Sequence, residues 1–157
     1  MNLPVRPETD RRIDELKTAF PHPGSALLPA LYLIQEERGH ISSESMEYVA
    51  GKIGVSPSYV AGVVSFYTLF HRQPVGRYHI QICRTLPCAL RGCGAVLAHL
   101  EKRLAIREGE TTRDGKFSLT TVECLGTCDT APMFQINERE FGPVDRAKMD
   151  EILKGLE

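Results

Sequence analysis

The chain of 157 residues is long enough for one domain of moderate size or two small ones. Its 19 basic and 20 acidic side chains give a net charge of −1, which argues against a nucleic acid or an anionic membrane surface as the main partner. No apolar run approaches the length of a membrane span. We therefore expect a cytoplasmic protein, and in that compartment cysteines more often bind metals or do redox work than form disulfides.

Residues 1–72 are predicted to form a helical bundle. Ile13, Leu16 and Phe20 follow a helical period, and the segment 21–24 then ends this first helix with prolines and a glycine. Three further helices are expected. Ser25 is expected to cap the second helix and Gly39 to end it, and the third is expected to begin at Ser42 or Ser43 and end at Gly54. Ser56 is expected to cap the fourth. Apolar residues at helical spacing supply the core of these helices: Leu27, Leu28, Leu31, Ile34, Met46, Val49, Ala50, Ile53, Val60, Val63, Val64, Tyr67 and Phe70.

The third and fourth helices also have the offsets of a helix-turn-helix, at Ala50, Gly54 and Val60. In a DNA-binding regulator the helix over 56–70 would read bases, yet it contains no Lys or Arg to offer to phosphates and base edges. Residues 1–72 hold seven basic and eight acidic side chains, so no electrostatic footprint for DNA exists. A packed helical bundle is the favoured interpretation.

The apolar period changes after a linker at residues 71–76. Tyr78, Ile80 and Ile82 alternate with polar residues, which predicts a half-buried strand that presents Cys83 at its carboxyl end. A turn over 85–88 follows. A single helix is then expected from about Leu90 to Leu104, with glycines near its start that allow a close approach of the backbone to a bound group.

The last third of the chain predicts two more strands and a helix. Residues 117–122 alternate as a strand, and residues 133–136 are expected to be its antiparallel neighbour, joined to it by the loop that contains Cys124 and Cys128. A closing helix is predicted over 145–156. The order strand, helix, strand, strand, helix predicts a small mixed sheet covered by helices, so the whole chain is assigned to the α+β class.

Four of the five cysteines form two pairs. Cys83 and Cys88 are spaced Cys-x4-Cys, and after a gap of 35 residues Cys124 and Cys128 are spaced Cys-x3-Cys. Four thiolates from two loops can hold an iron–sulfur cluster or structural zinc, or the cysteines can act as redox dithiols. Neither pair has the two-residue gap of zinc knuckles, which favours iron and sulfide. On spacing alone, Cys93 could replace Cys83 or Cys88 as a ligand.

The first cysteine pair, at the end of a strand, and the string Glu-Cys-Leu-Gly-Thr-Cys-Asp-Thr-Ala-Pro-Met-Phe-Gln-Ile-Asn at 123–137 resemble a known family. This is the thioredoxin-fold [2Fe-2S] subunit of NADH:quinone oxidoreductase, respiratory complex I, with related subunits in NAD-linked hydrogenases and formate dehydrogenases. Residues 139–143 depart from the resemblance, because a tyrosine-rich hairpin would be expected there.

The resemblance implies an N-terminal helical bundle at 1–72 and a thioredoxin-like [2Fe-2S] ferredoxin domain at 77–157, with a mixed sheet and flanking helices. It also implies that one [2Fe-2S] cluster is held by four ligands, Cys83, Cys88, Cys124 and Cys128. Cys93 lies outside the motif, and a buried structural cysteine is its simplest interpretation.

The expected function is electron transfer. No Gly-x-Gly-x-x-Gly fingerprint occurs, so NAD and flavin are expected on another chain. The resemblance implies that this partner is a flavoprotein subunit that binds FMN and oxidises NADH. This chain would then carry no catalytic residue and no complete active site, and would belong to the peripheral arm of a membrane-associated complex. The alternatives are the equivalent subunit of a hydrogenase or formate dehydrogenase, a zinc-stabilised helix-turn-helix regulator, and a free-standing thiol redox protein.

Overall fold

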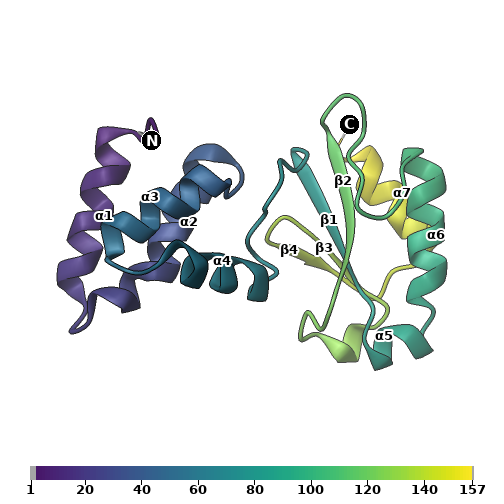
Figure 1. Ribbon diagram of the computed structural model, residues 1–157. Coiled ribbons are helices and arrows are strands. Elements are labelled where there is room, and N and C mark those ends of the chain that lie inside the picture. The colour runs from purple at the N-terminus through teal and green to yellow at the C-terminus, as the bar shows by residue number, and fades with distance from the viewer. Residues whose placement is uncertain (1–2, 157) are drawn as a thin grey trace. The chain divides into compact units, whose positions relative to one another are not determined.

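The computed structural model describes residues 3–156 and divides the chain into two compact units, one ending at Pro74 and the other beginning at Val75 (Figure 1). This division falls within the linker expected at 71–76. The outer limits of the expected domains, residues 1 and 157, lie outside the described residues. No helix within residues 3–156 has both the length and the apolar character needed to cross a bilayer.

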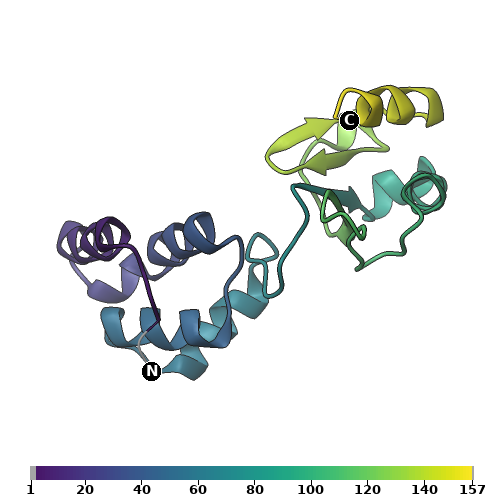
Figure 2. The same cartoon turned by 90° about the horizontal axis from the view of Figure 1, so that it is seen from above.

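The first unit is helical. In the described part of this unit the elements are α1 (Pro7–Ala19), η1 (Pro23–Ala26), α2 (Leu27–Arg38), α3 (Ser43–Ile53) and α4 (Pro57–Phe66). Figure 2 shows α1 beside α2 and α3 beside α4. The apolar faces of the helices meet in one core, which includes Ile13, Leu31, Ile34, Ile41, Val49, Val60, Val64 and Phe70.

Most helix ends in this unit follow from local sequence. The Ser42 hydroxyl accepts a hydrogen bond from the Ser45 backbone N–H at 3.2 Å, and Ser56 caps α4 in the same way. Gly39 and Gly54 end their helices with φ of 78° and 82°, a conformation that costs glycine little. The caps and stops predicted at these four positions are therefore confirmed.

Three details of the predicted bundle were wrong. Ser25 caps no helix, because the chain first forms the short η1 turn and α2 continues directly from it. Phe20 lies beyond the end of α1 and is 36% exposed, since the following Pro21 disfavours the helical conformation for the residue before it. The helix α4 stops at Phe66, which leaves Tyr67 partly exposed instead of on a helical stripe.

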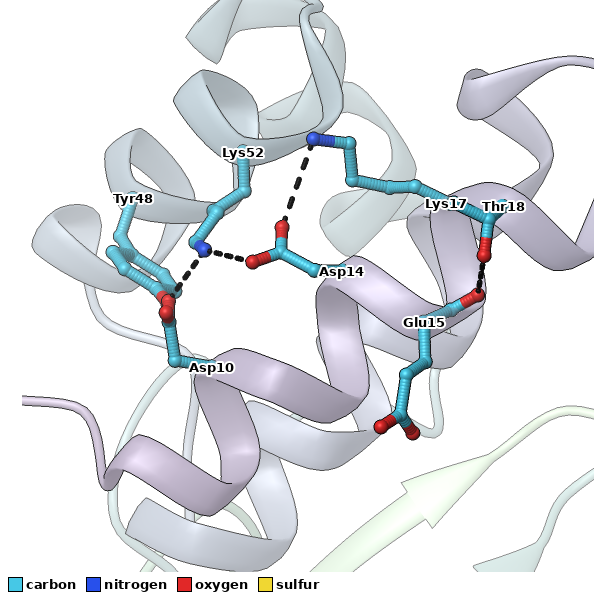
Figure 3. Close-up of polar contacts among 7 residues, drawn as sticks. All are labelled: Asp10, Asp14, Glu15, Lys17, Thr18, Tyr48 and Lys52. Atoms are coloured by element: carbon cyan, nitrogen blue, oxygen red, sulfur yellow. Dashed lines mark hydrogen bonds and ion pairs between the residues drawn. The ribbon is translucent and has the colours of Figure 1, made fainter.

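A charged group joins α1 to α3 (Figure 3). Lys52 Nζ lies 2.7 Å from Asp10 Oδ1 and 2.9 Å from Asp14 Oδ2, and the Tyr48 hydroxyl donates to Asp10. Hydrogen bonds from Lys52 and then from Tyr48 lower the pKa of Asp10 below its ordinary value. Lys17 reaches only Asp14, at 3.7 Å. Lys52 of α3 thus forms ion pairs with two carboxylates of α1.

We expect Lys52→Met to lower the stability of the chain at neutral pH by up to about 1 kcal/mol, because partly exposed ion pairs contribute little more than this. A carboxylate whose folded pKa is depressed stabilises the fold above its unfolded pKa of about 3.9, and this contribution is lost as the pH falls through the folded pKa. The difference between wild type and variant should therefore shrink below about pH 4. Urea unfolding at pH 7 and pH 3 measures this difference in the free energy of unfolding. Lys17→Met, which removes a cation that lies on α1 together with its partner Asp14, is the control and should change the stability less. An equal deficit at both pH values would contradict the ion-pair explanation.

The second unit is an α+β domain. Its described elements are β1 (Tyr78–Cys83), α5 (Leu86–Leu90), α6 (Cys93–Leu104), β2 (Phe117–Val122), η2 (Cys128–Thr130), β3 (Phe134–Ile136), β4 (Arg139–Phe141) and α7 (Arg146–Lys154). The strand order is β2-β1-β3-β4, with β1 parallel to β2 and the other neighbours antiparallel. Helices α6 and α7 lie side by side against the sheet (Figures 1 and 2). The predicted α+β class with a thioredoxin-like mixed sheet is confirmed.

The sheet differs from the predicted one at its centre. The strand β3 pairs with β1 and not with β2, and the loop between β2 and β3, which contains the η2 turn, passes the end of β1 to reach its far side. With neighbours on both sides, β1 is also more buried than its alternating sequence indicates. His79 is buried, and its Nε2 lies 2.8 Å from Thr120 Oγ1 on β2.

The turn expected over 85–88 in fact forms the short helix α5, and the helix expected from about Leu90 begins at Cys93 as α6. Gly92 takes φ of 91° between α5 and α6 and ends the first helical segment. A Cβ atom at Gly92 or Gly94 would meet nothing within 4 Å among the described residues. The close approach expected at these glycines is to a bound group, which contacts within the chain do not test, so it stays a prediction. Within the chain, Gly92 acts through its conformation.

Candidate metal centre

The first cysteine pair is buried at the carboxyl end of β1. Cys83 is the last residue of that strand and is 2% exposed, while Cys88 lies in α5 and is 1% exposed. The two side chains belong to the same buried cluster. They pack with Ala131 and Met133, which follow the second cysteine pair in the chain. The burial of two thiols among apolar groups keeps water away from this side of the site.

The second pair lies at the surface. Cys124 Sγ and Cys128 Sγ are 3.8 Å apart, and both residues are exposed. Two thiolates bound tetrahedrally to one metal at about 2.3 Å each would be separated by about 3.8 Å. Gly126 between them takes φ of 91°, which directs its backbone N–H to Cys124 Sγ at 3.3 Å. The loop thus holds its two sulfur atoms at the spacing of a metal-bound pair.

The strand order brings the two pairs together. Since β2 and β3 flank β1 on opposite sides, the loop between them must pass the end of β1, where Cys83 stands. Leu125, which lies between the two cysteines of the second pair, packs against the buried cluster that contains Cys83 and Cys88, and Arg84 Nη2 lies 2.7 Å from Glu123 Oε1, which links the two cysteine segments. Figure 1 shows α5 and the short turn after β2 at the same end of the sheet.

All four predicted ligand residues therefore lie at one end of the sheet, as two pairs. Within residues 3–156, no three His, Cys, Asp or Glu side chains surround a single ion position. The two pairs are suited to a centre with two metal atoms, in which each metal takes two of the four thiolates.

Electrostatics differ between neighbouring thiols. Burial acts to raise the pKa of Cys83, but hydrogen bonds from the Thr85 hydroxyl and from the backbone N–H groups of Leu125 and Thr85 outweigh burial and lower it. Burial raises the pKa of Cys88, and the adjacent Cys83 adds to that rise. The hydrogen bond with Cys124 and the charge of that residue raise the pKa of Cys128. The neighbouring thiols therefore resist simultaneous ionisation unless cations share the site.

The loop also contains a hydroxyl that lacks a partner. Thr127 Oγ1 is buried and forms no hydrogen bond with any described residue. A buried hydroxyl without an acceptor costs about 1–3 kcal/mol, so a group that supplies an acceptor here would be favoured. The sulfur atoms of an iron–sulfur cluster accept hydrogen bonds. The donor set and this unpaired hydroxyl both fit such a group.

Three further residues shape the site without having been predicted. Thr85 was interpreted as a turn residue, yet its hydroxyl contacts a cysteine. Thr127 showed no sequence signal beyond its place in the motif. Gly142, between β4 and α7, lies so close to the loop that a Cβ atom would be 2.5 Å from the Thr130 carbonyl oxygen. The Gly142 contact depends on tertiary packing and the Thr85 contact spans only two residues, and neither leaves a periodic pattern in the sequence.

Three more residues, one cysteine and two arginines, lie within or beside the segment of the first cysteine pair in the sequence. Cys93 is the first residue of α6 and is half-buried between two apolar clusters, in agreement with a structural cysteine. The Arg84 guanidinium is paired with Glu123, which offsets the charge that it could direct at the centre. Arg91 is exposed.

The fold and the cysteine pairs define a class of protein: a small α+β domain that carries a four-thiolate metal centre at one end of its sheet. The family model of the thioredoxin-like [2Fe-2S] ferredoxins matches residues 13–157. The chain therefore belongs to the thioredoxin-like [2Fe-2S] ferredoxin family, and the resemblance predicted from the sequence is confirmed. Ferredoxins of this kind are electron-transfer proteins.

Named relatives agree with this assignment. The chain is 44% identical over 144 residues to an E-type NADH-quinone oxidoreductase subunit of Rhizobium meliloti, covering 92% of this chain and 86% of the relative. It is 40% identical to NADH-quinone oxidoreductase subunit 2 of Thermus thermophilus, covering 92% and 81%. A chain of a solved NAD+-reducing [NiFe]-hydrogenase, in the air-oxidised state, matches with a TM-score of 0.70 and 27% sequence identity. The match covers 83% of this chain and 22% of the hydrogenase chain.

Proposed function

We propose that this chain is the [2Fe-2S] electron-transfer subunit of an NADH-quinone oxidoreductase, with Cys83, Cys88, Cys124 and Cys128 as the ligands of one cluster. The observation that carries the proposal is the meeting of two separate cysteine pairs at the end of β1, with Leu125 of one segment packed against the buried cluster that contains Cys83 and Cys88 of the other. The relatives named as subunits of that complex support the assignment of the complex.

A [2Fe-2S] cluster supplies one-electron chemistry when it is bound. The residues of this chain bind it, exclude water and present it. Cys83 and Cys88 lie on the buried side and shield it, whereas Cys124 and Cys128 are exposed and mark the side open to a partner. The Arg84–Glu123 ion pair holds the two ligand segments together. The cluster would carry out the redox chemistry, and the protein would set the position and the reduction potential of the cluster.

The partner in this proposal is a flavoprotein subunit that binds FMN and oxidises NADH, with which this chain exchanges electrons. The absence of a dinucleotide fingerprint from the sequence supports the placing of NAD and FMN on that subunit. Such a chain would reside in the cytoplasmic peripheral arm of a membrane-associated complex. The chain would have no catalytic residue of its own.

A hydrogenase is the second candidate for the host complex. The likeness to the NAD+-reducing [NiFe]-hydrogenase favours it, because the TM-score of 0.70 shows that the same fold occurs in a chain of such an enzyme. The higher identity and coverage of the oxidoreductase subunits favour the quinone reductase. Both candidates give this chain the same chemistry and differ only in its neighbours.

We expect the native protein to co-purify with an FMN-containing subunit. In the purified complex, the addition of NADH should reduce the cluster of this chain. Mass spectrometry of a mildly solubilised native extract identifies the partner, and low-temperature electron paramagnetic resonance (EPR) detects the reduced cluster. Partners that include a nickel-containing subunit would establish the hydrogenase alternative. A chain that is recovered alone, and is not reduced by NADH in the presence of any flavoprotein of the extract, would contradict both candidates.

A further inference from the structure

Thr85 occupies a helix-capping position but does not cap the helix. It precedes α5 in an extended conformation, with φ of −73° and ψ of 171°, where a threonine ordinarily accepts a hydrogen bond from the first turn. No such side-chain bond is formed. Its Oγ1 lies instead 3.3 Å from the sulfur of Cys83, two residues earlier at the end of β1. The Thr85 hydroxyl therefore contacts Cys83, a proposed cluster ligand, and does not cap α5.

The direction of this hydrogen bond follows from the chemistry of the two groups. A metal-bound cysteine is a thiolate and only accepts, whereas a threonine hydroxyl has one proton to donate. Because Cys83 is 2% exposed, water does not compete well for its sulfur, and a hydrogen bond is stronger in such surroundings than at the surface. Each turnover of the centre changes the negative charge on this sulfur and therefore the strength of the bond.

We propose that Thr85 is a positioning residue that raises the reduction potential of the centre by donating a hydrogen bond to Cys83. The inference rests on the proposed function, since it takes Cys83 to be a cluster ligand. When one electron enters from a reductant, no bond forms or breaks, and the added negative charge spreads onto the thiolates. A donor to one of these thiolates stabilises the reduced state more than the oxidised state, which makes reduction easier.

The test compares Thr85→Val, which keeps the shape and removes the hydroxyl, with Thr85→Ser, which keeps the hydroxyl. The full chain is loaded with iron and sulfide anaerobically, and the midpoint potential is measured by EPR-monitored titration with dithionite. We expect Thr85→Val to lower the equilibrium constant for reduction by about three- to tenfold, where tenfold equals 59 mV for a one-electron couple. Thr85→Ser should stay within about twofold of wild type, a smaller change than the loss of one hydrogen bond.

The potentials of the variants decide whether the Thr85 hydroxyl tunes the centre. An unchanged potential in Thr85→Val, or equal shifts in the Val and Ser variants, would overturn the role of the hydroxyl while the cluster itself is still formed. If Thr85→Val does not load, Thr85→Ala removes the same hydroxyl without adding bulk, and the same lowering is expected of it. A wild-type chain that takes up no [2Fe-2S] cluster would be a different failure, because it overturns the proposed function and this inference with it.

Discussion

Replacing Cys124 or Cys128 with serine is expected to abolish the red-brown colour of the iron-loaded protein. The two sulfur atoms are 3.8 Å apart, the spacing of a pair on one tetrahedral metal, so the loss of either leaves a metal with an incomplete thiolate set. We expect cluster occupancy to fall to about a tenth of wild type or less, since even residues that only support metal ligands cost 10–100-fold in affinity. Visible absorption and iron analysis after anaerobic reconstitution measure the effect.

Cys93→Ser is the matched control for these variants. Cys93 is half-buried at the start of α6 and packs against apolar residues, so serine there should keep the colour. The loss of colour in Cys93→Ser, with its retention in Cys88→Ser, would show that Cys93 replaces Cys88 among the ligands. Full colour in both Cys124→Ser and Cys128→Ser would remove the second pair from the site altogether.

Gly142→Ala is expected to disturb the cluster loop from outside. A Cβ atom at Gly142 would lie 2.5 Å from the Thr130 carbonyl oxygen and 2.8 Å from Met133 Cβ. The loop cannot simply move away, since the Val144 N–H also bonds to the Pro132 carbonyl at 3.0 Å. Overpacking of this kind costs about 1–3 kcal/mol, and the backbone shift would carry Cys128 with it. Urea unfolding measures the stability, and the rate of colour loss in a chelator measures the strain on the loop.

Gly155→Ala is the control for Gly142→Ala. Gly155 lies at the end of α7, where the nearest atom to an added Cβ would be 3.4 Å away and φ is −69°. We expect this variant to match wild type in both measurements. If Gly142→Ala unfolds and loses its colour no faster than Gly155→Ala, then the contact with Thr130 does not hold the loop in place.

The sequence allowed the elements and the four cysteines to be predicted because both depend on local pattern. The helices of the first unit follow from apolar period and from caps such as Ser42 and Ser56, whose hydrogen bonds span only three residues. The cysteine pairs were evident from spacing and from the string at 123–137. In each case the signal lies within one turn, one strand or one loop.

What the sequence did not reveal depends on long-range packing. The pairing of β3 with β1 could not be predicted from the alternating pattern, because strands pair through backbone N–H and C=O groups, which β1 and β2 present alike. Yet this pairing is what carries Cys124 and Cys128 past Cys83. The contact of Gly142 with Thr130 is likewise made between segments whose meeting no local pattern specifies. The contact of Thr85 with Cys83 spans only two residues, but the threonine hydroxyl takes it in place of a helix cap, a choice that no sequence pattern signals.

The most direct test of the central claim is an analysis of iron and inorganic sulfide together with EPR on the purified full-length chain after anaerobic reconstitution. We predict two irons and two sulfides per chain, as the [2Fe-2S] family requires, with a signal that appears only on reduction and is lost in Cys128→Ser. A protein that binds zinc without sulfide, or that gives the same signal in Cys128→Ser, would contradict the account.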